Sequence, residues 1–206
     1  MYGGPPRNNG MKKKVKDIAD IQIGYQFRGK VEADPNGTYK VVQIRDFEES
    51  LNLNLESLSK VAPKGDMTRY IVKKDDVLFL SRGQRNYAIP IRTSLESTIA
   101  ASYFFILRIK TAVVLPEYLA WYVNQAPAQE YLRNIARRGT HMPLVPLSAF
   151  SDLEVELPGL DTQKTIIEIS ELQEREKQLT KDLQEKRFRL VTSMCLKAAR
   201  KKEKKG

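Results

Sequence analysis

Residues 153–172, LEVELPGLDTQKTIIEISEL, contain a strand signal, a break and a helix signal in direct succession. The first five residues alternate apolar and acidic side chains, which is the pattern of a strand with one buried face. Pro158-Gly159 ends that strand, and Asp161 can cap the start of a helix. The stretch therefore predicts a boundary near residue 160 between a mixed α/β body and a helical segment.

The segment after this boundary has the composition of one long helix. Residues 162 to about 198 contain no proline or glycine and are rich in Glu, Lys, Gln, Leu and Arg. About 37 residues at a rise of 1.5 Å would form a rod of about 55 Å. Apolar residues recur in it with heptad-like spacing, interrupted by Glu176 and Lys186. These predicted dimerisation residues are Ile169, Leu172, Leu179, Leu183 and Leu190.

An isolated helix of this length would leave its apolar stripe in water, so the stripe predicts a partner helix. Because no second long helix pattern is present in the sequence, we expect the partner to be a second copy of the chain. The alternative is a helix that folds back on its own body. The division predicted for the chain is a disordered leader at 1–10, a folded body at 11–160, a dimerisation helix at 161–198 and a basic tail at 199–206.

Strand and helix signals are mixed within the body, which predicts an α+β fold. We expect a short amphipathic element ending at a glycine (15–24), two β-rich stretches (38–47 and 69–72) and a buried strand (77–80). These are followed by a long central strand (97–109), a helix that starts at a proline (116–125), a second helix (about 127–137) and a half-buried strand (153–157).

The composition of the whole chain favours a globular protein with an anionic partner. The chain has 206 residues, of which 41% are hydrophobic and 29% charged, a balance that suits one core and one appendage. The net charge of +10 favours nucleic acid over an anionic membrane; the alternative is a basic surface that only aids solubility. Cys195 is the single cysteine, and no export signal or membrane span is seen, so we expect a cytoplasmic protein without disulfides.

Motifs for catalysis are not found in the sequence. His141 is the only histidine, and together with one cysteine it cannot form a metal site built from these ligands. Neither a Gly-x-x-x-x-Gly-Lys-Ser/Thr loop nor a Gly-x-Gly-x-x-Gly motif is present. We therefore expect no catalytic residue, no metal site and no cofactor in this chain.

Positive charge is concentrated in two windows of the body. Glu96 is the only acid between Asp76 and Glu117, and none lies between Glu130 and Asp152. Arginine and side-chain amides can make paired hydrogen bonds to base edges, and arginine also binds phosphates. Three loops are therefore predicted to bind DNA, with solvated polar loops as the alternative. Their residues are Tyr25, Gln26 and Arg28; Arg82, Gln84, Arg85 and Asn86; and Arg137, Arg138, Thr140 and His141.

The order of motifs resembles a target-recognition domain of the DNA-specificity subunit of type I restriction–modification systems. The matching stretches are Val15-Lys16-Asp17-Ile18-Ala19 with Gly24, Lys74-Asp75-Asp76-Val77-Leu78-Phe79, Leu115-Pro116-Glu117-Tyr118-Leu119, and the strand, proline and long helix between Leu147 and Ile166. Asp75 stands where the family tends to have glycine before the aspartate.

The resemblance implies a recognition domain followed by a spacer helix. Subunits of this family carry two such domains and two helices that pair as an antiparallel coiled coil, and each domain reads half of a split DNA site. S-adenosylmethionine, ATP and magnesium are expected on separate methyltransferase and restriction subunits. The present sequence contains one domain and one helix, so two copies would restore the two-domain form and read a palindromic site. The alternative function is a coiled-coil interaction module with a non-specific basic surface.

Overall fold

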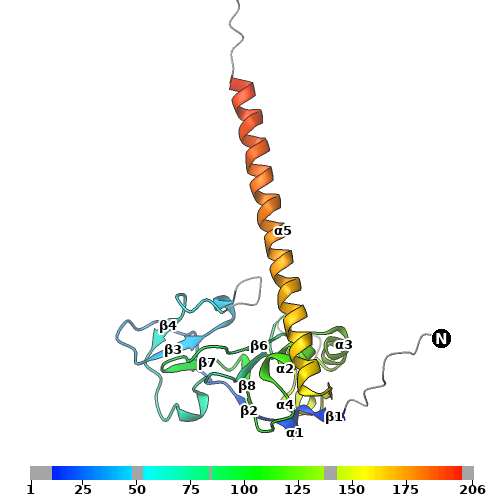
Figure 1. The fold of residues 1–206 in the computed structure, drawn as a ribbon. Coiled ribbons are helices and arrows are strands. Elements are labelled where there is room, and N and C mark those ends of the chain that lie inside the picture. The colour runs from blue at the N-terminus through cyan, green and yellow to red at the C-terminus, as the bar shows by residue number, and fades with distance from the viewer. Residues whose placement is uncertain (1–10, 48–52, 84, 137–142, 201–206) are drawn as a thin grey trace, which may run out of the picture. The chain divides into compact units, whose positions relative to one another are not determined.

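The computed structural model describes residues 11–47, 53–83, 85–136 and 143–200 (Figure 1). The chain forms two compact units, Met1–Ile167 and Glu168–Gly206. We call the first unit the body. It contains three sheets with helices at one end, and the second unit contains most of one long helix. The expected α+β class is confirmed.

A four-stranded sheet forms the centre of the body, in the order β2 (Ala19–Ile23), β8 (Phe104–Ile109), β5 (Val77–Leu80) and β6 (Ala88–Pro90). All neighbouring strands are antiparallel. The predicted strand Val77–Leu80 is confirmed, and its four side chains are buried. Successive residues point to opposite faces of a sheet, so Val77 and Phe79 enter one core while Leu78 and Leu80 enter another. A strand with two covered faces needs an uninterrupted apolar run.

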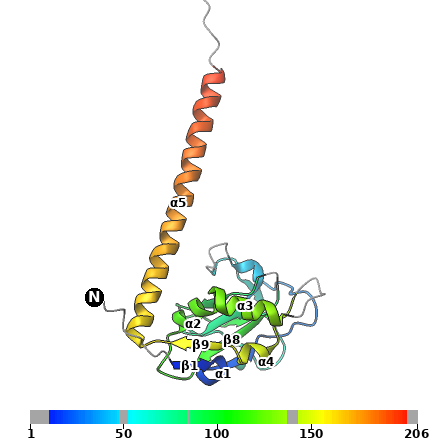
Figure 2. The ribbon, with the colours of Figure 1, turned by 90° about the vertical axis from the view of Figure 1, so that its right-hand side faces the viewer.

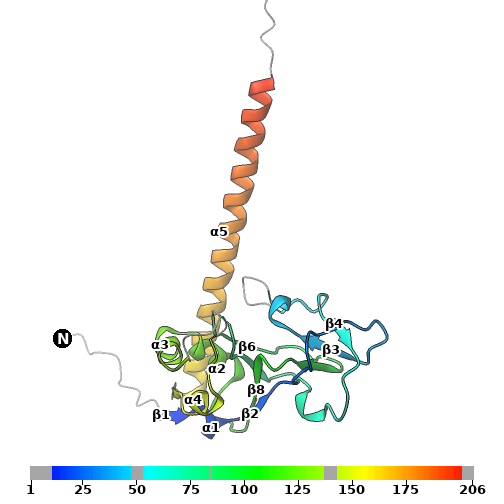
Figure 3. The same ribbon diagram turned by 180° about the vertical axis from the view of Figure 1, so that it is seen from behind.

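A three-stranded sheet lies at the end of the body opposite α3 (Figures 1 and 3). Its order is β4 (Ser59–Val61), β3 (Tyr39–Val42) and β7 (Thr98–Ala100). The β3–β4 pair is antiparallel and the β3–β7 pair is parallel. The third core of the body packs around Val41, Val61 and Ile99 of these strands.

The expected single strand over 97–109 is wrong. Residues 98–100 form β7 of the three-stranded sheet, residues 101–103 turn, and residues 104–109 form β8 of the four-stranded sheet. Bonds from distant segments make this corner: Ala101 N–H donates to Val42 O at 3.1 Å, and Ser102 N–H donates to Tyr25 O at 2.9 Å. The run is mostly apolar because both strands enter cores, so its composition does not reveal the corner.

The other end of the body holds a short antiparallel pair and four helices (Figure 2). The pair is β1 (Met11–Lys14) with β9 (Glu154–Leu157), and the helices are α1 (Val15–Ile18), α2 (Pro116–Val123), α3 (Ala126–Ile135) and α4 (Leu147–Ser151). The half-buried strand predicted from LEVEL is confirmed, because Val155 and Leu157 are buried between exposed glutamates. Phe150 of α4 stacks on Phe79 at 4.1 Å, which joins the helices to the central sheet.

Three further expectations are corrected. The amphipathic element expected at 15–24 is α1 followed directly by β2. The β-rich stretch at 69–72 lies mainly in a 3-10 turn, η2 (Thr68–Tyr70), and only Ile71 forms a bridge, to Ile99. The stretch at 38–47 is β3 followed by a second 3-10 turn, η1 (Ile44–Asp46). Propensity for β-structure does not distinguish short 3-10 turns from strands when neighbouring residues decide the backbone pairing.

The long helix predicted from residue 162 is α5 (Leu160–Arg200). Its first turns belong to the body, where Gln163 is completely buried. The Gln163 Oε1 accepts a bond from Leu115 N–H at 3.0 Å, and Nε2 donates to Val113 O and Pro158 O, both at 2.8 Å. Ile166 and Ile167 pack against the core. One amide thus fixes the start of the helix to the loop before α2.

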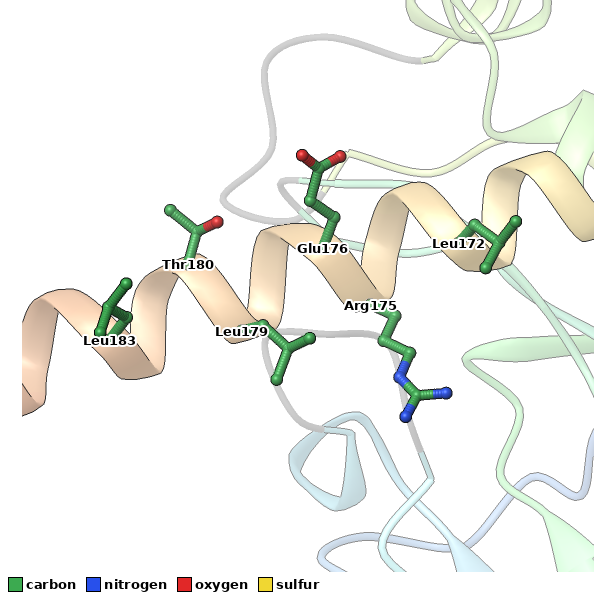
Figure 4. A pocket seen from close by; sticks show the side chains of 6 residues that line it. All are labelled: Leu172, Arg175, Glu176, Leu179, Thr180 and Leu183. Carbon is green, nitrogen blue, oxygen red and sulfur yellow. The ribbon is translucent and has the colours of Figure 1, made fainter.

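The second unit presents the predicted apolar stripe on the surface of α5. Its five side chains are between 49% and 67% exposed. A shallow groove of about 350 Å³ follows the stripe, and it is lined by Leu172, Arg175, Glu176, Leu179, Thr180 and Leu183. Figure 4 shows Arg175 projecting to one side and Glu176 and Thr180 to the other. Across the described ranges, no helix combines the length and apolar character needed to cross a bilayer.

Candidate nucleic-acid interface

The Arg82 loop, residues 81–86, begins where β5 ends. Ser81 is buried, and both its N–H and its Oγ–H donate to Tyr103 O, at 2.8 and 2.9 Å. Leu80 N–H donates to Tyr87 O at 2.9 Å and closes the loop. Arg82 and Arg85 are exposed beyond this closure. The strand therefore holds two arginines at the surface on a backbone that is fixed on both sides, as a DNA-contact loop requires.

Asn86 has a different environment from the two arginines. It is partly buried, and its Nδ2 donates to Leu80 O at 2.9 Å. This donor is used within the loop, so the residue helps to shape the loop that carries Arg82 and Arg85. Its contact with a base stays a prediction. Gln84 lies outside the described residues.

Backbone bonds join the Arg82 loop to the segment before α4. Gly83 N–H donates to Pro143 O at 3.1 Å, and Val145 N–H donates to Ser81 O at 2.9 Å. Gly83 has a φ of +140°, a backbone conformation that residues other than glycine rarely adopt. The residues of the third predicted loop, Arg137, Arg138, Thr140 and His141, lie outside the described residues and directly precede this segment in the chain.

The Tyr25 loop, residues 24–28, follows the end of β2. Gly24 is required there because a Cβ atom would lie 2.2 Å from Ala101 O. The Tyr25 ring packs edge-on against Phe27 and Tyr70, with centroids at 4.8 and 5.3 Å, and its hydroxyl donates to Lys64 O at 3.3 Å.

Two other residues of this loop are exposed, Gln26 and Arg28. The Gln26 Nε2 donates to Phe27 O at 3.1 Å. Tyr25 therefore braces the loop, while Gln26 and Arg28 have the surface positions that a DNA contact needs.

The Arg82 and Tyr25 loops meet at the turn between β7 and β8. Tyr25 N–H donates to Ala100 O at 2.8 Å and Ser102 N–H donates to Tyr25 O, while Tyr103 O accepts both bonds from Ser81. Because β8 runs antiparallel to β2 and β5, its first residue lies beside the last residues of both strands. Two predicted loops that are more than 50 residues apart in the sequence thus share one edge of the sheet. The turn was missed in the sequence because 97–109 has the pattern of one strand.

Some of the basic residues in the acid-poor windows are used inside the body. Arg108 Nε lies 3.6 Å from Asp76 Oδ1, and its Nη2 donates to Ile71 O at 2.7 Å. Lys110 Nζ lies 3.2 Å from Asp20 Oδ1. Burial raises the pKa of Asp76, whereas the Lys73 N–H and Arg108 act in the opposite direction. Arg82 and Arg85, by contrast, are exposed in the loop that adjoins the shared edge.

The described ranges contain no group of three or more His, Cys, Asp or Glu residues placed to hold a metal ion. Asp75 and Asp76, adjacent in sequence, have separate environments: Asp75 is exposed with a φ of +70°, and Asp76 is buried. Glycine adopts this φ without strain, so the glycine that the resemblance leads us to expect before the aspartate would fit this backbone.

A comparison with known families finds that the sequence profile of the type I restriction modification DNA specificity domain matches residues 8–186. The chain belongs to this family. The match covers both the body and most of α5, so the family expected from the order of the motifs is confirmed. DNA specificity, rather than catalysis, is the role that the family description names.

Related proteins agree with the assignment to the type I DNA specificity domain family. The HindI specificity subunit of Haemophilus influenzae is 25% identical over 160 residues, which are 76% of this chain and 34% of that protein. The HsdS subunit of Thermoanaerobacter tengcongensis has a similar fold, with a TM-score of 0.64, 17% identity, and coverage of 100% of this chain and 52% of the other. The S subunit from M. genitalium gives a TM-score of 0.55 at 15% identity, covering 87% of this chain and 43% of the other.

The chain spans about a third to a half of the length of these relatives. The structural likeness is at low identity and therefore supports the fold, including a long helix after the mixed-sheet domain.

Proposed function

We propose that this chain is a non-catalytic subunit that binds a specific DNA sequence and directs methyltransferase and restriction subunits of a type I restriction–modification system to a bipartite site. The observation that carries the proposal is the shared sheet edge, where the loop with the exposed Arg82 and Arg85 and the Tyr25 loop are both hydrogen-bonded to the turn between β7 and β8. Rigid strands hold these side chains, and rigid placement is what recognition of base edges requires.

Family membership supports the DNA-binding part of this proposal. S-adenosylmethionine, ATP and magnesium belong, in this proposal, to the partner subunits, and the complex acts in the cytoplasm. A solved structure that concerns complex assembly of the type I restriction–modification system has a similar fold, with a TM-score of 0.63 at 14% identity.

The proposal includes pairing of two chains through α5. Association would cover the exposed stripe, and the charge along the helix favours an antiparallel arrangement. Residues 160–180 contain five acidic and three basic residues, whereas residues 181–200 contain two acidic and six basic residues. Two antiparallel copies place the acidic half of each helix beside the basic half of the other, and two parallel copies place like charges together. A twofold pair reads a palindromic, interrupted site.

Binding to a randomised duplex library tests the central claim. The full-length protein is mixed with the library, bound duplexes are sequenced over several rounds, and affinities are measured for the enriched duplex and for a random one between 50 and 200 mM salt. We expect both affinities to fall steeply with salt, because phosphate contacts release counterions. The enriched duplex should keep an advantage of about 1,000-fold or more. If no consensus emerges and only salt-sensitive binding remains, the alternative of an interaction module with a non-specific basic surface is correct.

A further inference from the structure

We propose that the turn between β7 and β8, residues 101–103, is a further DNA-contact element, in which the Ser102 hydroxyl bonds to a base edge and the Tyr103 hydroxyl donates to a backbone phosphate. This inference rests on the proposed function. It adds two residues that the sequence pattern did not predict to bind, and it gives the ligand as duplex DNA read between the Arg82 and Tyr25 loops.

The position of the turn is the first argument. Its backbone bonds to both loops: Ser102 N–H donates to Tyr25 O at 2.9 Å, and Tyr103 O accepts the N–H and Oγ–H of Ser81. A surface that contacts DNA with both neighbouring loops brings the duplex over the element that lies between them. Ser102 and Tyr103 are both partly exposed at this place.

The rigidity of the turn is the second argument. The Tyr103 side chain packs against two of the three cores of the body, so the direction of its ring is fixed by packing on both sides. The Ser102 backbone is held by the bond from its N–H to Tyr25 O and by the close packing of Gly24 against the preceding carbonyl, Ala101 O. Fixed side chains lose little conformational entropy on binding, which favours specific contacts over transient ones.

The chemistry of the two side chains is the third argument. A serine hydroxyl can donate to or accept from base edges, and a tyrosine hydroxyl donates to phosphate oxygens. Both lie in a stretch without acidic residues, since none is present between Glu96 and Glu117. The turn therefore offers hydrogen bonds to an anionic partner without a nearby repelling charge in its own segment.

Two single-atom changes test the inference. Ser102→Ala removes a hydroxyl at a partly exposed position, and Tyr103→Phe removes the phenol oxygen while keeping the ring in both cores. The full-length variants are passed through the randomised duplex library, and affinities are measured for the wild-type consensus duplex and a random duplex. Ser94→Ala is the control, because it removes an exposed hydroxyl from the loop that leaves the opposite end of β6.

We expect each variant to bind the wild-type consensus about 3- to 10-fold more weakly, with the loss concentrated at one or two base positions for Ser102→Ala. Ser94→Ala should bind as the wild type does, and thermal unfolding of all three should be unchanged. If Ser102→Ala and Tyr103→Phe both bind with the affinity of the wild type and select its consensus, this inference is overturned while the proposed function stays intact. A wild-type protein that selects no consensus at all would instead contradict the proposed function.

Discussion

Asp76 fixes the start of β5 through one interaction in its own turn and one with the distant strand β8. Its carboxylate accepts a bond from Lys73 N–H at 2.8 Å and faces Arg108 Nε at 3.6 Å. The guanidinium of Arg108 also donates to Ile71 O. The Asp76 side chain is only 5% exposed, so removal of the carboxylate leaves a partly buried positive charge without its partner. The strand that carries the Arg82 loop therefore depends on one carboxylate at its other end.

Asp76→Ala should lower the free energy of unfolding by about 2–3 kcal/mol, because Arg108 loses its counter-charge and the turn loses its acceptor. Urea unfolding followed by circular dichroism measures this. Asp20→Ala is the matched control, since Asp20 pairs with Lys110 at an exposed site and its loss should cost about 0.5 kcal/mol. Equal losses for the two variants would show that the buried pair contributes no more than the exposed one.

Arg82→Ala or Arg85→Ala should reduce discrimination between the consensus and a random duplex by about 1–3 kcal/mol if the residue reads a guanine. If it contacts only phosphate, affinity for both duplexes should fall together and the salt slope should shrink by about one. Lys74→Ala serves as the control, because it removes an exposed cation at the other end of the same strand. Unchanged discrimination and unchanged salt dependence in both arginine variants would remove the loop from the interface.

The sequence contains part of the information about these residues. The acid-poor windows contain the exposed Arg82 and Arg85, but they also include Arg108, whose partner Asp76 is 32 positions earlier in the chain. Asn86 is similar, since its Nδ2 bond to Leu80 O depends on how the loop closes. Composition shows which side chains can bind DNA, whereas only the fold shows which of them are already used.

Elements with strong local signals were predicted well from the sequence. The run Val77–Leu80 and the helix starting after Pro158-Gly159 are both present, because uninterrupted burial and a long stretch without helix breakers are local properties. The corner at 101–103 depends on bonds to Val42, Tyr25 and Ser81, and these contacts are not visible in a local pattern. The centre of the candidate interface was therefore the part that the sequence could not provide.

Gln163 shows how one side chain can fix the start of α5. Its amide makes three bonds to backbone groups of residues 113, 115 and 158 while being completely buried. Gln163→Leu should destabilise the body by about 2–3 kcal/mol, because it leaves buried backbone groups without partners. Thr162→Leu, at the exposed preceding position, is the control and should change stability by less than about 0.5 kcal/mol. Thermal unfolding measures both, and equal effects would contradict the anchoring role.

At the scale of the whole molecule, the chain combines a recognition body with a helix whose apolar stripe is exposed. The net charge of +10 would disfavour association of two copies unless charges of opposite sign meet at the interface. The opposite charge balance of the two halves of α5 provides this in the antiparallel arrangement. The apolar stripe could be predicted from the sequence because heptad spacing is periodic. The sequence of one chain does not show which helix covers that stripe.

Leu179→Glu should convert the proposed pair to monomers, because it places a charge in the stripe on each helix. Light scattering at micromolar concentration measures the change in mass. Phe188→Glu is the matched control: Phe188 lies nine residues further on, half a turn around the helix from Leu179, and is 74% exposed. A wild-type protein that is already monomeric, alone and with its methyltransferase, would rule out pairing of this chain, and equal masses for the two variants would remove the stripe from the interface.

The alternating placement of the β5 side chains in two separate cores limits where this protein can vary. None of the four residues of the strand can be exchanged freely, since each fills a packed interior on one face or the other. The exposed side chains of the loops beyond the strand ends do not have that requirement. New DNA sequence preferences are therefore expected to arise by exchange of loop residues on an unaltered sheet. Transplanting residues 82–86 between relatives is a direct route to altered targeting.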